Sequence, residues 1–215
     1  MSRIFPVTPP ALPAPNETYS PIWLRNLNNI LRLYFNRMVN AVNTVTGKAG
    51  GQYLDFPNGL FFSSEEQYLA AVDTPQAITY NNTYLNNYVD LAEGSTSRIR
   101  AGASGIYSFQ LSAQLESGNN SAKTMVIWIR RDGQDIPFSA RVFTLAGAVS
   151  LPLAWGFSID LQQGQYVEIM SQTDDLDLHF HTGAASATHP AASAAIMTVH
   201  LISLLPDVLP TLPST

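Results

Sequence analysis

The segment Gly105–Leu115 alternates between apolar and polar side chains without a single interruption. Its apolar members are Tyr107, Phe109, Leu111, Ala113 and Leu115, and its polar members are Ser108, Gln110, Ser112 and Gln114. Successive side chains of a β-strand point to opposite faces, whereas a helix would scatter this pattern around its whole circumference. The segment is therefore predicted to be a long strand with one buried face, on which other strands must pack.

The chain from residue 59 to residue 203 holds many more short apolar runs, separated by turns rich in Gly and Asn. We predict strands at Leu60–Ser63, Ala77–Tyr80, Tyr88–Leu91, Ser97–Ala101, Ile106–Leu115, Thr124–Arg130, Ala140–Leu145, Leu153–Leu161, Tyr166–Ser171, Leu176–Thr182 and Ala195–Ser203. The Asp132-Gly133 pair is typical of a tight hairpin turn. Pro137 and Pro152 are expected at strand starts or sheet edges. Short strands without intervening helices indicate an all-β antiparallel sandwich or barrel.

A helix is expected over residues 21–47, before the strands begin. Ser20 is a good N-cap, Pro21 suits the first helical position, and Gly47 provides a stop. An apolar seam with three–four spacing runs through Leu24, Leu27, Leu31, Tyr34, Met38, Ala41 and Val45. The seam is wide enough for a coiled coil of three or more helices. The alternative is an amphipathic helix that packs on the core of its own domain.

Two proline-rich arms, residues 1–20 and 204–215, flank the helix and the strands. Prolines at this density prevent helices and central strands and favour an extended chain. The apolar side chains of such an arm cannot bury one another, so we predict that they dock on a partner surface. The docking residues are expected to be Ile4, Phe5, Val7, Leu12 and Trp23. The alternative is a disordered terminus. A Gly-rich hinge is expected over residues 48–58.

Composition and missing motifs exclude several classes of function. A net charge of −5 argues against nucleic acid as a partner, and the absence of Cys excludes thiolate chemistry and disulfides. The sequence contains no nucleophile elbow, phosphate loop or His-Glu-x-x-His motif, so we expect no enzyme and no cofactor. No apolar run is long enough to insert into a membrane, and the first twenty residues lack a secretion signal. A charged fraction of only 13% favours a subunit that is buried among neighbours.

A metal ion is the one ligand for which the sequence offers candidate residues. If Leu176–Thr182 is a strand, Asp175, Asp177, His179 and His181 share one face, while Leu176, Leu178 and Phe180 share the other. Side chains two residues apart on a strand are close enough to converge on one ion. The alternative is an ordinary solvent-facing strand with carboxylate–imidazole pairs.

Two sets of motifs carry a resemblance to known proteins. Gly105-x-Tyr107-x-Phe109, the strand ending at Arg130-Arg131-Asp132-Gly133 and the turn Leu161-Gln162-Gln163-Gly164-Gln165-Tyr166-Val167 resemble the complement-q and tumour-necrosis-factor-like jelly roll. Gln165 departs from the Asp that is usual in that turn. The region Lys123–Met170 also looks like structural proteins of short-tailed bacteriophages of aquatic bacteria. The resemblance implies a ten-stranded, double-sheet jelly roll over residues 59–203 that assembles as a tight homotrimer.

The resemblance further implies a virion protein assembled in the host cytoplasm. We expect a capsid decoration, cement or head-fibre protein that contacts the major capsid protein or tail and portal proteins. The alternative is a tail-associated fibre or a receptor-binding module for host surface glycan, since the Tyr- and Asn-rich segment 80–88 suits sugar stacking. We expect that segment to be an ordinary polar turn between strands rather than a glycan-binding surface. The small-residue loop Gly183–Ala195 is either a partner-facing surface or a spacer.

Overall fold

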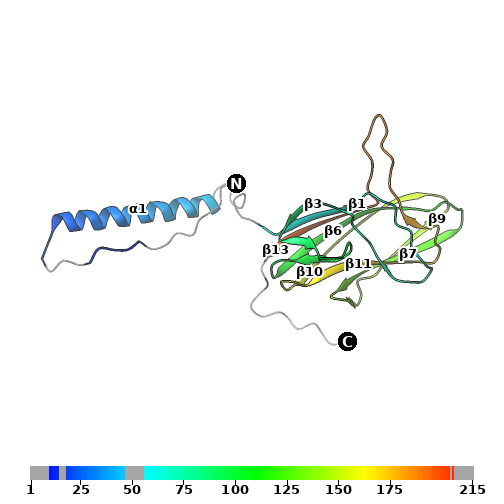
Figure 1. Ribbon diagram of the computed structural model, residues 1–215, viewed down its shortest axis with the longest axis horizontal. Helices are drawn as coiled ribbons and strands as arrows, with labels where there is room; N and C mark the ends of the chain where they lie inside the picture. The colour runs from blue at the N-terminus through cyan, green and yellow to red at the C-terminus, as the bar shows by residue number, and fades with distance from the viewer. Residues whose placement is uncertain (1–9, 15–17, 47–55, 204, 206–215) are drawn as a thin grey trace. The chain divides into compact units, whose positions relative to one another are not determined.

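The computed structural model describes residues 10–14, 18–46, 56–203 and 205. The chain divides into two compact units, Met1–Asp55 and Phe56–Thr215. Among the described residues of the first unit, one helix, α1, extends over Pro21–Thr46 (Figure 1). The backbone N–H groups of Trp23 and Leu24 donate to the side-chain and main-chain oxygens of Ser20, at 3.3 and 3.0 Å. The predicted N-cap is therefore confirmed. Among the described helical residues, no stretch is long and apolar enough to cross a membrane.

The second unit consists of two antiparallel sheets. The first sheet has the strand order β10–β6–β13–β1–β3, with β12 also paired to β6. Its strands are β1 (Asn58–Ser63), β3 (Asn82–Asn87), β6 (Gly105–Glu116), β10 (Ser150–Leu161), β12 (His179–Phe180) and β13 (Ala195–Ser203). The second sheet has the order β4–β5–β11–β7–β8, with β2 paired to β11 and β9 paired to β7. Its strands are β2 (Gln76–Ala77), β4 (Val89–Leu91), β5 (Ile99–Ala101), β7 (Ala122–Arg131), β8 (Gln134–Asp135), β9 (Arg141–Ala146) and β11 (Tyr166–Thr173).

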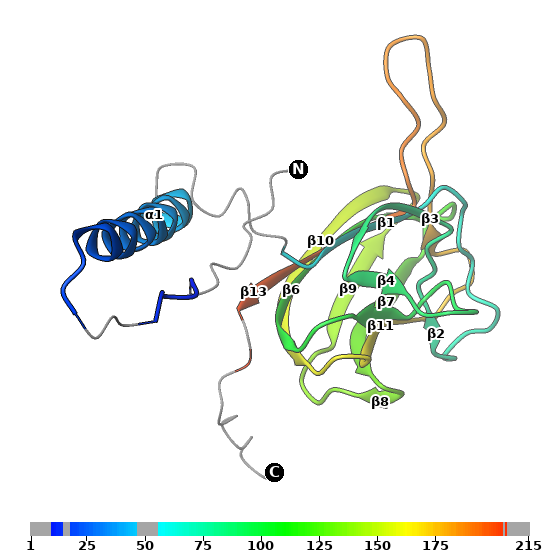
Figure 2. The same ribbon diagram turned by 60° about the vertical axis from the view of Figure 1, so that its left-hand side comes forward.

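The two sheets lie face to face, and the chain crosses between them repeatedly (Figure 2). The connections that pass from one sheet to the other include those from β6 to β7, from β9 to β10, from β10 to β11 and from β11 to β12. This double-sheet arrangement is a jelly roll. Of the thirteen strands in the described residues, β2, β8 and β12 have only two residues, and the other ten are longer. The all-β fold class, with a helix before it, is confirmed.

The core of the sandwich is built around β6, as the alternation predicts. Tyr107, Phe109, Leu111 and Leu115 are at most 2% exposed, while the intervening polar side chains face outward. β6 pairs with β10 on one side and with β13 on the other. The opposite sheet supplies the facing side chains Val89, Ile99, Met125, Ile127, Ile129, Val167 and Ile169. Every residue of the core cluster belongs to the second unit, so this unit has a core of its own.

The β7–β8 hairpin confirms the predicted turn. Asp132 and Gly133 have φ angles of 47° and 80°, the left-handed conformation that a two-residue type I′ turn requires at both positions. Pro152 lies in β10, an edge strand of the first sheet, as expected.

The strand prediction is wrong at four places, the first being the predicted strand Ala77–Tyr80, which overlaps the two-residue strand β2 only at Ala77. Segment 82–87 is strand β3 rather than a polar turn, and its lack of alternation follows from its position at the sheet edge, where most of its side chains are exposed. The two-residue strand β8 was not predicted. The predicted strand Leu176–Thr182 is reduced to β12, because residues 174–178 form a turn in which Leu178 N–H donates to the Asp175 carbonyl (3.1 Å).

The loop between β12 and β13 projects away from the sandwich in both views (Figures 1 and 2). Gly183 and Ala192 pair at its base, with N–O distances of 3.0 and 2.8 Å, and residues 184–191 are exposed. The projecting loop therefore presents mostly small residues, together with His189, to the solvent. Its base continues directly from β12 and from His181.

Two buried tyrosines provide a test of the packing. Tyr107 Oη donates to the Ala103 carbonyl (2.7 Å), whereas Tyr80 Oη is buried without a hydrogen-bond partner among the described residues. Tyr107→Phe is expected to lower the free energy of unfolding by about 1 kcal/mol, because it removes a hydrogen bond. Tyr80→Phe is expected to leave it unchanged or to raise it. Urea unfolding of both variants measures the difference, and equal losses would contradict it.

Candidate functional site

The predicted helical seam is partly accessible to solvent. Leu27, Leu31, Tyr34 and Ala41 are half-buried, and Leu24 and Met38 are exposed. The side chain of Val45 lies outside the described residues. Further large apolar side chains are exposed along the same helix, namely Ile22, Leu33, Phe35, Val39 and Val42. The helix thus exposes more apolar surface than the contact between two helices of a coiled coil would bury.

The docking residues predicted in the N-terminal arm fall partly outside the described structure. Ile4, Phe5 and Val7 lie outside the described residues, and Leu12 is 55% exposed. Trp23 is half-buried, and its indole N–H donates to the Ala14 carbonyl (2.7 Å). This bond ties the end of the segment 10–14 to the first turn of the helix.

The outward face of the first sheet carries two neighbouring rows of uncharged side chains. Strand register aligns the first row as Ala154, Ser112, Ile196 and Phe62, and the second as Gly156, Gln110, Thr198 and Leu60. A shallow hollow of about 380 Å³ lies across β6, β10 and β13 within these rows. A sheet face of this kind has no formal charge to desolvate in a contact, but Gln110, Ser112 and Thr198 need hydrogen-bond partners there.

Aromatic side chains gather at the adjacent open edge of the sandwich. Trp155 and Phe157 of β10 and Phe143 of β9 are half-buried against the core. Phe157 stacks on Phe109 with ring centroids 5.1 Å apart, and Trp155 lies 5.0 Å from Phe157. β9 and β10 are both edge strands, so these rings are only partly covered by their own chain.

The structure separates the four residues that the sequence proposed as a metal site. The turn at residues 174–178 breaks the expected alternation, so Asp175 and Asp177 do not share a strand face with the histidines. Asp175 Oδ1 accepts the Asp177 N–H (3.0 Å). Asp177 Oδ2 accepts the N–H groups of Gly118 and Asn119, at 2.8 and 2.9 Å. Both carboxylates therefore hold the turn.

Asp177 also pairs with a buried lysine. Lys123 is 1% exposed, and its Nζ lies 2.6 Å from Asp177 Oδ2 and donates to Ser117 Oγ as well. The hydrogen bond from Lys123 holds the pKa of Asp177 below its usual value, and the Gly118 and Asn119 N–H groups add to this effect. A buried ammonium group needs such a partner, since its desolvation is otherwise uncompensated. The pair joins β7 to the turn that precedes β12.

His179 and His181 do come together, but with glutamates instead of aspartates. Donor atoms of Glu66, His179 and His181 lie within 4.8 Å of one another. His181 Nδ1 is 3.1 Å from Glu66 Oε1 and 2.7 Å from Glu116 Oε2. Glu66 lies in the loop after β1, and Glu116 is the register partner of His179 at the end of β6. We call Glu66, His179, His181 and Glu116 the His–Glu cluster.

Neighbouring groups orient the members of the His–Glu cluster. His179 is 8% exposed, stacks on Tyr68 at 4.2 Å, and has its Nδ1 3.0 Å from the Asp177 carbonyl oxygen. Tyr68 Oη donates to Glu66 Oε2 (2.9 Å), and this hydrogen bond raises the pKa of Tyr68. Sequence inspection missed Glu66, Glu116 and Tyr68 because they lie far from the histidines along the chain. Gln67, the residue between Glu66 and Tyr68, pairs with Phe180. This pairing of two distant segments corresponds to no pattern in the sequence.

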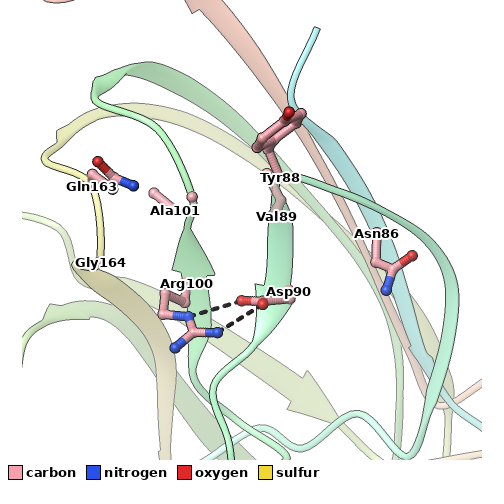
Figure 3. A pocket seen from close by; sticks show the side chains of 9 residues that line it. Asn86, Tyr88, Val89, Asp90, Arg100, Ala101, Gln163 and Gly164 are labelled. Carbon is pink, nitrogen blue, oxygen red and sulfur yellow. Dashed lines mark hydrogen bonds and ion pairs between the residues drawn. The ribbon is translucent and has the colours of Figure 1, made fainter. Parts of the chain in front are cut away.

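A second hollow of about 380 Å³ lies beside β4 and β5 (Figure 3). Two of its lining residues, Asn86 and Tyr88, belong to the segment 80–88 that was considered for glycan recognition. Arg100 lines this hollow and donates to both oxygens of Asp90, at 3.0 and 2.8 Å, which raises the pKa of Arg100. Tyr88 is 59% exposed beside this pair, and Asn86 also lines the hollow. An exposed ring next to amide, carboxylate and guanidinium groups is chemically suited to a polar ligand.

Comparisons with known proteins add a likeness in structure. The globular domain of a zebrafish complement 1qA protein is similar, with a TM-score of 0.46 and 16% sequence identity over 69% of this chain and 99% of that chain. No family model matches the sequence, and no curated protein matches it significantly. The strand order of the two sheets, and not this likeness, defines the fold class.

The Lys123–Asp177 pair predicts a dependence of stability on pH. Because the pKa of Asp177 is lowered in the folded state, the stabilisation is fully present above the unfolded value of about 3.9 and is lost as the pH falls through the lower folded value. Asp177→Asn should therefore lower the Tm at pH 7. The difference in Tm between this variant and the wild type should become smaller below about pH 4. Glu65→Gln, an exposed carboxylate change, is the control. Equal melting temperatures at pH 7 would contradict the role of the pair.

Proposed function

We propose that this protein is a non-enzymatic, homotrimeric structural protein of a bacteriophage virion, attached to the particle through its N-terminal arm and helix. The phage assignment comes from the sequence resemblance of Lys123–Met170, and a capsid decoration, cement or head-fibre position follows from the short shaft that a single helix provides. Its location is then the virion, and its partners are other virion proteins.

The observation that carries the proposal is the presence of two unlike surfaces on the same jelly roll. The outward face of the first sheet has two uncharged rows, and the aromatic edge next to it is incompletely covered. If the edge of one subunit packs on the face of the next, the contact is heterologous, and three copies close a ring when each is rotated by a third of a turn from its neighbour. Such packing covers Trp155 and Phe157 with rows of side chains that carry no formal charge.

The helix supports attachment in a different way. It belongs to a separate unit from the sandwich, and several of its large apolar side chains are exposed. In a trimer, three copies of the helix can share the seam from Leu24 to Ala41, and the remaining apolar side chains can contact the particle. Burial of apolar area contributes about 25 cal/mol per Å², so a few side chains per chain, repeated three times, give firm attachment.

A second candidate function is recognition of host surface glycan. The hollow beside Tyr88, Asp90 and Arg100 favours it, because it combines an exposed aromatic ring with several hydrogen-bonding groups (Figure 3). The two functions are separate proposals, because the hollow lies at the end of the sandwich where the chain enters it: Asn87, which adjoins the lining residues, donates to the Phe56 carbonyl (2.8 Å). Adsorption to cells then separates them.

The trimer proposal predicts both the mass and the effect of a charge on the sheet face. Light scattering of the full chain should give three times 23.5 kDa. Ser112→Arg places a charge in the middle of the first uncharged row and should raise the concentration at which the trimer dissociates by more than about tenfold, as expected for a desolvated charge. Sedimentation over a dilution series measures this change.

Thr96→Arg is the matched control for the charge. Thr96 is an exposed residue between β4 and β5, at the edge of the second sheet opposite to β9, so its replacement should leave the dissociation unchanged. A wild-type monomer at micromolar concentration, or a Ser112→Arg trimer as stable as the wild type, would refute the proposed contact.

Attachment is tested by removing the arm and the helix. A shortened chain that starts at Gln52 keeps every residue of the core cluster and should remain folded and soluble. It should nevertheless fail to bind particles that lack the native protein, in a co-sedimentation assay. Full binding would place the attachment surface in the jelly roll.

If particles without the protein also lose adsorption to cells, glycan recognition becomes the favoured function.

A further inference from the structure

We propose that the His–Glu cluster is a zinc site, with Glu66, His179 and His181 as ligands. The three residues offer one carboxylate and two imidazoles, a donor set typical of Zn²⁺ and unlike the all-oxygen sets that Ca²⁺ and Mg²⁺ prefer. Two glutamates at the cluster balance the charge of the ion. The site is independent of the proposed role in a virion.

The spacing of the donors fits a single small ion. Zn–N and Zn–O distances of about 2.0–2.1 Å at tetrahedral angles place two ligands roughly 3.3 Å apart. His181 Nδ1 and Glu66 Oε1 are already 3.1 Å apart, and donor atoms of all three residues lie within 4.8 Å of one another. The side chain of Glu66 is 36% exposed, so it can rotate to close the remaining distance.

Hydrogen bonding leaves His179 ready to act as a ligand. A carbonyl oxygen can only accept, so His179 Nδ1, 3.0 Å from the Asp177 carbonyl, carries the proton in the neutral ring. Nε2 then holds the free lone pair that a metal requires. An imidazole whose second nitrogen donates to a backbone carbonyl is the usual arrangement at zinc sites. Stacking on Tyr68 fixes the plane of the same ring.

The remaining groups form a supporting shell around the ligands. Tyr68 Oη holds Glu66 Oε2, which leaves Oε1 directed at His181. Glu116 Oε2 lies 2.7 Å from the same nitrogen, His181 Nδ1, so a zinc ion bound there replaces the proton shared with Glu116, which then provides a second carboxylate at the site. Asp177, whose carbonyl orients His179, is itself held by Lys123. Each ligand side chain thus has a neighbour that restricts its orientation, which a chance meeting of surface charges does not require.

A bound ion would connect three separate segments of the chain. Glu66 belongs to the loop after β1, His179 to β12, and His181 to the base of the projecting loop. Because these segments are joined otherwise by only short pairings such as Gln67 with Phe180, zinc would act as a structural clamp. The clamp sets the direction in which the projecting loop leaves the sandwich.

The test is titration of the full-length protein, first treated with EDTA, with ZnCl₂ in a calorimeter. We expect one Zn²⁺ per chain and a Tm that rises with zinc concentration, because the ion binds only the folded state. His181→Gln and Glu66→Gln should each lower the affinity by about 100-fold. Tyr68→Phe, which removes only the orienting hydrogen bond, should lower it by about 10-fold.

Matched controls keep the result interpretable. His189→Gln changes an exposed histidine of the projecting loop and Glu65→Gln changes the neighbouring exposed carboxylate, and both should bind zinc like the wild type. Circular dichroism and the Tm in EDTA establish whether each variant is folded. If His181→Gln does not fold, the zinc affinity of Glu66→Gln provides the test. Absence of zinc binding at micromolar concentrations, or equal affinity in the wild type and Glu66→Gln, overturns the proposal.

Discussion

The packing of the β6 side chains is the interaction on which the rest of the sandwich depends. Tyr107, Phe109 and Leu111 are buried between the sheets, and β6 is also the strand that pairs with β10, β13 and β12. Each large aromatic side chain buries roughly 150–250 Å², so this single face provides much of the apolar area that opposes the loss of chain entropy. The same strand therefore fixes the register of three neighbours, and through them the positions of the side chains on the outward face.

The two surfaces invoked for assembly follow from this register. Because β6 holds Tyr107 and Phe109 inward, Gln110 and Ser112 must face outward, where β10 and β13 align them with other uncharged residues. The sandwich is open at β10, so Phe157 can stack on Phe109 but remains partly uncovered. An uncharged face and a partly uncovered aromatic edge are thus two consequences of one core, and the proposed trimer would cover both.

The polar groups concentrate where β6 ends. Glu116 there meets β12, and the turn that leads into β12 is held by Asp177 on the buried Lys123. The same turn offers its backbone carbonyl to His179. The buried ion pair and the His–Glu cluster are therefore physically connected, and a change in the turn should affect both the stability of this end and the geometry of the cluster.

Much of the fold could be predicted from the sequence because side-chain period is a local property. The alternation of Gly105–Leu115, the Asp132-Gly133 turn and the Ser20 cap each follow from residues close together in the chain, and the structure confirms all three. The site could be predicted only in part. His179 and His181 are two residues apart, so their proximity was expected, but a turn hydrogen-bonded through Asp175 removed Asp177 from their face. Glu66, Tyr68 and Glu116 reach the histidines only because β1, β6 and β12 are brought together by strand pairing, and no local pattern encodes contacts between segments that distant in the chain.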